Sequence, residues 1–169
     1  MGTKIEDVHH QKAMKKIKEL ADAADICLFA TNLTELPLSA RPMSRQQIDD
    51  DGTLWFFSEK DSHKNLHIQQ DNRVQLFFSN RNSSEYLSIN GTAEIIKDDA
   101  KAEELWSPMA KTWFNGGPED PSLTIIKVVP QDGYYWDTKD GKLVTLLKIA
   151  AGTIMGKEID GSLEGKVKP

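Results

Sequence analysis

Four side chains that can bind an anion flank a short turn in this sequence. Arg41 precedes the turn, and Ser58, Ser62 and Lys64 follow it. The turn is the run Asp-Asp-Asp-Gly at 49–52, between two strand-like segments, which predicts a β-hairpin. A two-residue turn would place Arg41 opposite a position between 60 and 62. The hairpin therefore predicts that the arginine, the lysine and the serines lie close together.

These side-chain types can bind a phosphate group. A guanidinium forms two parallel hydrogen bonds to phosphate, a lysine ammonium supplies a point charge, and hydroxyls are small donors. A helix that begins near Ser62 would add free backbone N–H groups at its positive end. Asp61 opposes a phosphate site, because its carboxylate would repel the anion unless it turns away or caps the helix. An edge arginine beside a capped surface helix is the alternative.

The elements that must position this cluster are mostly strands. Apolar residues at helical spacing predict an opening helix at about 5–23. Shorter helices are expected from Asp61 or Ser62 to about Gln70, and from Asp98 onward. Apolar and β-branched runs predict strands at roughly 25–32, 37–48, 53–58, 73–79, 84–97, 123–137 and 142–155.

This order of elements predicts a mainly β fold. We expect a closed or nearly closed antiparallel β-barrel with peripheral α-helices, because helices and strands alternate too irregularly for a doubly wound parallel sheet. Residues 1–157 are predicted to form a single domain. Residues 158–169, in which glycine alternates with charge, are predicted to be a flexible C-terminal tail.

Composition narrows the partners and the compartment. The 169 residues carry a formal net charge of −5, which argues against non-specific binding to nucleic acid. The sequence has neither an apolar run long enough to span a bilayer nor a signal peptide, so we expect no membrane partner and a cytoplasmic protein. The single cysteine, Cys27, lies in an apolar run and is expected to be a small buried hydrophobic residue.

The histidines and the acidic turn predict no metal site. His63 and His67 are four residues apart and could chelate a metal from one helix face. However, no cysteine or clear carboxylate signature completes a ligand set. The acidic run at 49–51 is better explained by the turn that leads into Gly52.

Short runs occur in a fixed order at 40–43, 55–58, 62–64, 106–109, 113–117, 120–121 and 135–137. In this order they resemble the pyridoxamine 5′-phosphate oxidase-like FMN-binding split barrels. The sequence is most similar to the general stress protein 26 branch of that family, up to about residue 157. The resemblance implies six to seven antiparallel strands of Greek-key type. It also implies an FMN cofactor, with FAD as the alternative.

The resemblance assigns roles to the cluster around the hairpin. It implies that Arg41, Ser62 and Lys64 bind the FMN phosphate. Ser58 follows Phe57 as an aromatic-hydroxyl pair at the end of the third strand, and we expect Ser58 to bind the phosphate as well. His63 replaces an arginine of the true oxidase, which would weaken phosphate binding.

The resemblance also implies contacts with the rest of the flavin. The backbone of Pro42, Met43 and Ser44 would border the isoalloxazine and ribityl region. Trp113 corresponds to a segment that lies near the flavin of the neighbouring subunit, which implies a homodimer with the flavin at its interface. In the alternative interpretation, Trp113 and Phe114 are hydrophobic anchors that fix a loop.

The resemblance identifies a ligand and leaves the reaction open. The true oxidase holds its substrate with a C-terminal arginine and histidine, and residues 156–169 contain neither, so oxidation of pyridoxamine phosphate is not expected. We expect a flavin-dependent oxidoreductase acting on an unknown small molecule, with catalytic residues unassigned. A non-catalytic protein that buffers or senses flavin is the alternative, and an interaction module without flavin is a third.

Overall fold

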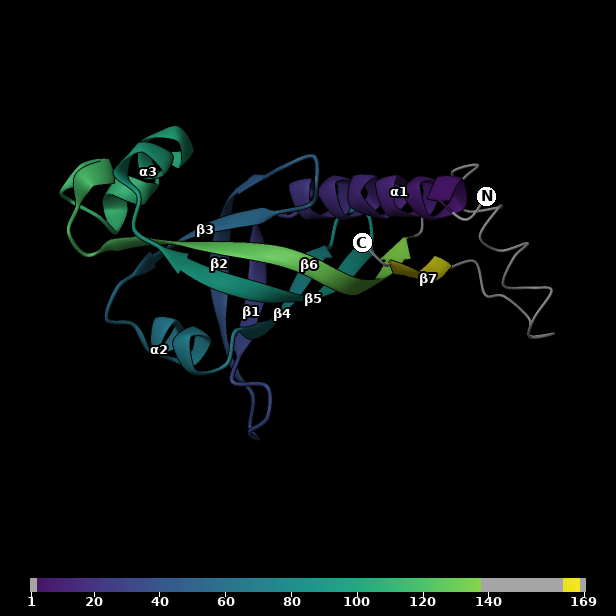
Figure 1. Cartoon of the computed structure of the whole chain (residues 1–169), viewed down its shortest axis with the longest axis horizontal. Coiled ribbons are helices and arrows are strands. Elements are labelled where there is room, and N and C mark those ends of the chain that lie inside the picture. The colour runs from purple at the N-terminus through teal and green to yellow at the C-terminus, as the bar shows by residue number, and fades with distance from the viewer. Residues whose placement is uncertain (1–2, 138–162, 168–169) are drawn as a thin grey trace.

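The computed structural model describes residues 3–137 and 163–167 (Figure 1). Helix α1 (Thr3–Asp22) leads into strands β1 (Ile26–Thr31), β2 (Ser39–Ile48) and β3 (Leu54–Glu59). Helix α2 (His63–Gln70) then leads to β4 (Arg73–Asn80) and β5 (Glu85–Ile96). Helix α3 (Asp99–Leu105) and two 3-10 turns, η1 (Ala110–Thr112) and η2 (Gly117–Glu119), precede β6 (Leu123–Asp137) and β7 (Leu163–Val167).

Six antiparallel strands close into a barrel. Their order is β3-β2-β1-β4-β5-β6, and β6 pairs back onto β3. Strands β1, β2 and β3 follow one another directly, whereas β4 returns through α2 to lie beside β1. The resulting spatial order of β4-β1-β2-β3 is a Greek key, in which α2 is the long connection. The predicted mainly β barrel with peripheral helices is therefore confirmed.

Alternating residues of the strands fill the barrel, and α1 covers its core. Cys27 and Phe29 of β1 are buried and lie opposite Met43 and Arg41 of β2, so these four residues share the inner face. Helix α1 contributes buried apolar residues at helical spacing: Ala13, Met14, Ile17, Leu20 and Ala21. This stripe joins the barrel residues in one hydrophobic cluster.

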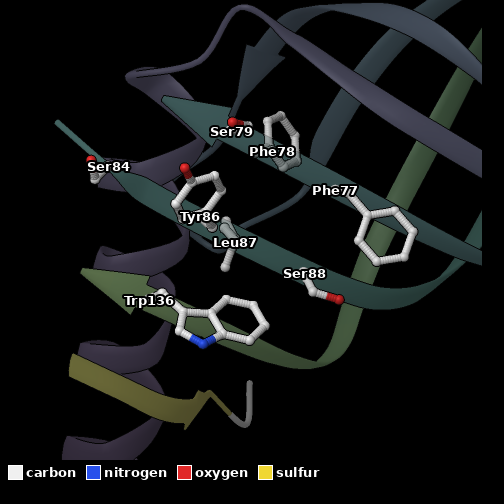
Figure 2. Close-up of a pocket in the computed structure, with 8 residues that line it drawn as sticks. All are labelled: Phe77, Phe78, Ser79, Ser84, Tyr86, Leu87, Ser88 and Trp136. Carbon is white, nitrogen blue, oxygen red and sulfur yellow. The ribbon is translucent and has the colours of Figure 1, made fainter. Parts of the chain in front are cut away.

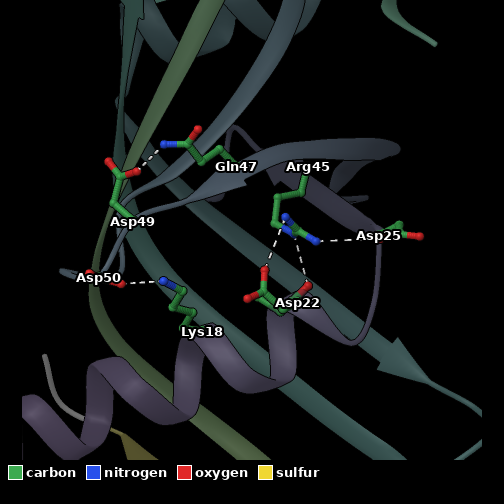
Figure 3. Close-up of polar contacts among 8 residues, drawn as sticks. Lys18, Asp22, Asp25, Arg45, Gln47, Asp49 and Asp50 are labelled. Atoms are coloured by element: carbon green, nitrogen blue, oxygen red, sulfur yellow. Dashed lines mark hydrogen bonds and ion pairs between the residues drawn. The ribbon is translucent and has the colours of Figure 1, made fainter. Parts of the chain in front are cut away.

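Polar contacts fix the C-terminal half of α1 to β2 and to the β2–β3 turn (Figure 3). Arg45 donates from Nε to the carbonyl oxygen of Ala21 over 3.1 Å, which satisfies a carbonyl near the helix end. Its guanidinium also pairs with Asp22 at 3.4 Å and with Asp25 at 3.6 Å. Lys18 forms an ion pair with Asp50 of the turn. Helix and hairpin are thus held together by charge as well as by apolar packing.

The β2–β3 turn is one residue longer than predicted. The backbone N–H of Asp49 donates to the Thr53 carbonyl over 2.9 Å, and Gly52 donates back to Asp49 over 3.0 Å. Gly52 has a φ of +83°, which glycine adopts without strain. A three-residue loop that ends in a left-handed glycine is a common hairpin connection. The expected two-residue turn is therefore wrong.

A β-bulge then ends the pairing between β2 and β3. Arg45 lies opposite Phe56 and Gln47 opposite Trp55, so Gln46 is the extra residue on β2. The β2–β3 ladder stops at the Arg45–Phe56 pair, whereas β3 remains paired with β6 as far as Glu59. Beyond the bulge, residues 39–44 of β2 therefore have no paired partner on β3 in the described structure. The barrel is split along this line.

A second, smaller core lies between the barrel and the segment with α3 and η1. Asp98 caps α3, as predicted, by accepting from the backbone N–H of Lys101. The cluster combines residues of β3 and β6 with those of the helical segment: Trp55, Phe57, Leu123 and Ile125 with Ala102, Leu105, Ala110 and Phe114. It fixes this segment against the start of β6.

The C-terminal predictions have mixed outcomes. The predicted strand at 142–155 lies outside the described residues. The sequence predicts a flexible tail over 158–169, whereas the structure places Leu163–Val167 in β7, paired with residues 133–137 of β6. Strand β6 extends beyond its pairing with β3, and β7 satisfies the backbone groups of that further stretch. Among the described helices, none is both long and apolar enough to cross a membrane.

Candidate phosphate-binding site

Arg41 is held by neutral acceptors on β1 and β2. Its Nη1 donates to the carbonyl oxygen of Phe29 over 3.1 Å and to Oγ1 of Thr31 over 2.8 Å. Its Nη2 donates to Oγ of Ser39 over 2.6 Å. The Nε–H and one Nη2–H meet no acceptor among the described residues. Arg41 therefore has a fixed guanidinium with donors to spare, and burial lowers its pKa.

Lys64 lies in the first turn of α2, and the charge of Arg41 affects its pKa. Burial lowers the pKa of Lys64, the positive charge of Arg41 lowers it further, and Glu59 acts in the opposite direction. Among the described residues, no carboxylate forms an ion pair with either cation. Two partly buried cations that repel each other would be stabilised by an anion between them.

Ser62 caps α2 beside these cations. Its Oγ accepts from the backbone N–H of Asn65 over 3.4 Å, as expected for an N-cap serine. The cap and the end of the helix at Gln70 agree with the sequence prediction. His63, the first residue of α2, is exposed. The helix therefore brings Ser62 and Lys64 to one end, where its first backbone N–H groups also lie.

Ser58 is placed differently from the expectation. It is only 2% exposed, and its hydroxyl donates to Oδ1 of Asn65 over 2.7 Å. A serine hydroxyl has one proton, so this bond leaves Ser58 no donor for a phosphate. Its oxygen also lies 3.2 Å from Oγ of Ser62. Ser58 therefore orients the cap residue from within the protein.

Asn65 connects α2 to two strands, and sequence reasoning missed it. Its Nδ2 donates to Oγ1 of Thr124 over 2.9 Å and to the carbonyl oxygen of Lys60 over 3.3 Å. Thr124 donates in turn to the carbonyl oxygen of Ser58 over 2.9 Å. One feature of the sequence could have indicated this role. Asn65 follows the capping Ser62 by three residues, and asparagine is unfavourable within a helix unless its side chain forms hydrogen bonds outside the helix.

Thr31 and His67 are two further polar residues of the cluster that sequence reasoning did not place there. Thr31 is fully buried at the end of β1, and its Oγ1 lies 3.0 Å from Nδ1 of His67. From the sequence, His67 was considered only as a metal ligand paired with His63, and no metal site was predicted. Within the described residues, no group of three or more His, Cys, Asp or Glu side chains is placed to hold a metal.

The residues expected beside the flavin ring lie along the split. Pro42 is exposed, Ser44 is half-buried, and the Met43 side chain is part of the barrel core. All three belong to the stretch of β2 that β3 does not pair with. Phe57 is buried in the second core. The side chains of Met43 and Phe57 are thus occupied by packing in the two cores.

Trp113 and Phe114 have different environments. Phe114 is 6% exposed and belongs to the second core, which agrees with a hydrophobic anchor. Trp113 is 77% exposed. No hydrogen bond or ring contact between described residues joins Trp113 to Arg41 or Lys64. Within one chain, the structure does not bring Trp113 into the cluster.

A separate cavity lies over β4, β5 and β6 (Figure 2). It has a volume of about 570 Å³ and is lined by Phe77, Phe78, Ser79, Ser84, Tyr86, Leu87, Ser88 and Trp136. None of the predicted site residues lines it. Its walls are mostly aromatic and aliphatic and offer no cation, so it is unsuited to a phosphate.

Comparison with known proteins identifies the family. The family model described as pyridoxamine 5′-phosphate oxidase like matches residues 12–160. This chain belongs to that family. General stress protein 26 of Bacillus subtilis is 23% identical over 130 residues, which cover 74% of this chain and 89% of that protein. Protein bli-3 of Neurospora crassa is 28% identical over 112 residues, 62% of this chain, and this chain spans about half of its length (54%).

Solved structures of similar proteins share the fold. A general stress protein 26 from Jannaschia sp. CCS1 superposes with a TM-score of 0.67 at 24% identity, covering 96% of this chain and 98% of that one. The general stress FMN/FAD binding protein of Xanthomonas citri superposes with a TM-score of 0.63 at 28% identity, covering 76% of this chain and 89% of that one. The predicted resemblance to the general stress protein 26 branch is thus confirmed.

Proposed function

We propose that this chain binds FMN, with the flavin phosphate held between Arg41 and Lys64, and that it acts as a flavin-dependent oxidoreductase on a small molecule. The observation that carries the proposal is the pair of partly buried cations without a carboxylate partner among the described residues. A phosphate dianion would balance both charges. The similarity to a flavin-binding protein of Xanthomonas citri supports the same ligand.

The described donors fit a phosphate in number and type. Arg41 has two N–H groups to spare, Lys64 adds an ammonium, and the N-terminus of α2 adds backbone N–H groups that no helical carbonyl accepts. The single proton of Ser62 is used on Ser58, so Ser62 serves the site as the cap of the helix. Ser58 and Asn65 support this arrangement by fixing the cap residue and the helix. His63 is exposed beside them and would contribute little to the phosphate site.

The remaining flavin contacts extend the proposal to a dimer. The isoalloxazine ring would lie along residues 42–44 of β2, which pair with β1 but not with β3. Trp113 is exposed and makes no described hydrogen bond or ring contact with the cluster of its own chain, which suits a contact with the flavin of a partner subunit. A homodimer with the flavin at its interface would place both halves of the site together. A monomer mass in light scattering, measured with flavin bound, would contradict this arrangement.

When bound, the flavin would supply the electron-transfer chemistry, and the chain's own residues would bind and orient it. Arg41 and Lys64 would neutralise the phosphate and fix one end of the cofactor. The buried network of Ser58, Asn65 and Thr124 would hold α2 in place during that binding. Cys27 is no candidate nucleophile, because burial raises its pKa to about 12.

Flavin titration tests the proposal directly. Purified protein mixed with FMN should retain an absorbance band at roughly 450 nm after gel filtration, which reports bound oxidised flavin. Parallel titrations with FAD would show which flavin is preferred. If neither flavin binds even in excess, the third interpretation, an interaction module without flavin, is favoured.

A non-catalytic flavin-binding protein is the second candidate. The described cluster consists of binding groups, and its one inward-facing histidine, His67, is bonded to Thr31. Anaerobic mixing of the flavin-loaded protein with NADH or NADPH, followed by reoxidation with candidate acceptors, separates the two functions. Turnover with any donor supports the oxidoreductase, and its absence with all donors supports buffering or sensing of flavin.

A further inference from the structure

Three side chains from three elements form a continuous chain of hydrogen bonds. His67 of α2 lies 3.0 Å from Thr31 of β1 through Nδ1 and Oγ1, and Thr31 accepts from Nη1 of Arg41 over 2.8 Å. We propose that His67 is a positioning residue, which fixes the Arg41 guanidinium for phosphate binding through the Thr31 hydroxyl. This inference rests on the proposed function, because it concerns the same phosphate site.

The chemistry of the three groups sets the direction of each bond. Arg41 can only donate, so Oγ1 of Thr31 is its acceptor. The hydroxyl proton of Thr31 is then available for Nδ1 of His67. If Nδ1 also donated to Thr31, the hydroxyl proton of Thr31 would need another acceptor. Water cannot serve as that acceptor, because Thr31 is fully buried. The chain is therefore satisfied when Nδ1 is unprotonated and the ring proton is on Nε2.

The chain restricts how Arg41 can turn. Both N–H groups of Nη1 are used, one on the Phe29 carbonyl oxygen and one on Thr31. With Nη1 fixed, the plane of the guanidinium is fixed too, and the spare donors on Nε and Nη2 keep one direction. A hydroxyl that His67 does not orient could rotate and present its proton toward Arg41. His67 thus keeps a lone pair of Thr31 turned toward the arginine.

The same chain joins the two cations of the site. His67 lies one helical turn after Lys64, so the bond to Thr31 fixes α2 against β1, the neighbour of the strand that carries Arg41. The charge of Arg41 lowers the pKa of Lys64, so the two cations repel each other when no anion is bound. The Thr31–His67 bond ties α2, which carries Lys64, to β1 despite that repulsion.

The test compares FMN with riboflavin, which has no phosphate. Binding is measured by quenching of flavin fluorescence in the full chain. We expect His67→Ala to weaken FMN binding about tenfold, the loss of one charge-assisted contact, and to leave riboflavin binding within about twofold of wild type. A defect in folding or in the ring site would weaken both ligands equally. Gln69→Ala, at an exposed position of the same helix, is the matched control and should change neither.

A conservative variant and a double-mutant cycle complete the test. In His67→Asn, Oδ1 can take the place of Nδ1 as acceptor, so FMN affinity should return to within about threefold of wild type. Thr31→Val removes the middle hydroxyl and should weaken FMN about tenfold by itself. Adding His67→Ala to Thr31→Val should then lower FMN affinity by less than about twofold more, because Thr31→Val has already broken the hydrogen-bond chain that His67 belongs to.

The outcomes that overturn the inference differ from those that overturn the proposed function. If wild type binds neither flavin, the proposed function fails and the inference fails with it. If wild type binds FMN but His67→Ala weakens FMN and riboflavin equally, or weakens neither, His67 does not position Arg41. Additive effects of Thr31→Val and His67→Ala, or no recovery in His67→Asn, overturn the inference as well.

Discussion

Two arginines on the same strand have different charge environments. Arg41 and Arg45 flank the buried Met43 on the inner face of β2. Arg45 has a side chain that is 12% exposed and pairs with the carboxylates of Asp22 and Asp25. Arg41 bonds to a carbonyl and two hydroxyls, with no carboxylate partner among the described residues.

The different charge environments distinguish a cation that stabilises the fold, Arg45, from one that can bind an added anion, Arg41. A buried charge is costly unless an opposite charge lies nearby. Arg45 is balanced by aspartates of the α1 region, so its charge contributes to the fold. Arg41 is oriented by neutral groups and repelled by Lys64. Residue type, strand and face are the same, so the nearby carboxylates decide which arginine can bind an added anion.

The largest expected effect is on FMN binding by Arg41. Arg41→Met keeps much of the aliphatic side chain and removes the guanidinium. We expect FMN affinity to fall about 100-fold, equivalent to roughly 2.7 kcal/mol, since a bidentate contact to phosphate is lost. Flavin fluorescence titration measures the loss. An affinity within threefold of wild type would mean that the phosphate binds elsewhere.

Replacing Arg45 should change stability instead. Arg45→Met removes two ion pairs and the bond to the Ala21 carbonyl oxygen. We expect the free energy of unfolding to fall by about 1–2 kcal/mol, because the guanidinium is mostly buried but its aspartate partners are half or largely exposed. Urea denaturation measures this change. FMN affinity of the folded variant should stay within about threefold, and a larger loss would remove the contrast between the two arginines.

Lys64 should show opposite effects on binding and stability. Its lowered pKa means that folding disfavours the charged form while the site holds no anion. Lys64→Met should therefore raise the melting temperature of flavin-free protein at neutral pH while weakening FMN about tenfold. Differential scanning calorimetry and titration measure the two quantities. A lower melting temperature would indicate that Lys64 has a stabilising partner instead.

The smallest expected effect is a decrease in FMN affinity at alkaline pH. The pKa of Lys64 lies below its ordinary value of 10.5, and only the charged form attracts phosphate. FMN affinity should thus decline as pH rises through that pKa, and part of the decline should be absent in Lys64→Met. Ionisation of the flavin itself affects both proteins alike, so the difference between the profiles isolates the lysine. Identical profiles would contradict the prediction.

The local parts of this arrangement were predictable from the sequence. Ser62 as the cap of α2, its end at Gln70 and the turn that leads into Gly52 all follow from residue types close together in the chain. The barrel followed from the order of strands and from the family resemblance. These features depend on backbone preferences that a short segment expresses by itself.

The remaining parts depend on residues distant in sequence. Ser58 is a plausible phosphate donor in the sequence, but Asn65 takes up its proton and Thr124, 66 residues away, bonds to its carbonyl oxygen. His67 meets Thr31 only because α2 crosses back toward β1. Residue types that are close together in the sequence do not predict such contacts. The β2–β3 loop has three residues where two were predicted, and its Gly52 lies so close to Met14 of α1 that a Cβ would not fit there.

The bulge at Gln46 determines which way each half of β2 faces. Before it, the buried Met43 is odd-numbered, and after it the buried Ile48 is even-numbered. The extra residue thus works as a phase shift between two alternating patterns. If the same ten residues formed a regular strand without the bulge, Met43 and Ile48 would face opposite sides of the sheet. If Ile48 then kept its place in the core, Met43 would point to solvent and Arg41 would turn away from Thr31. The orientation of a cation at one end of β2 is thus set by a bulge five residues away.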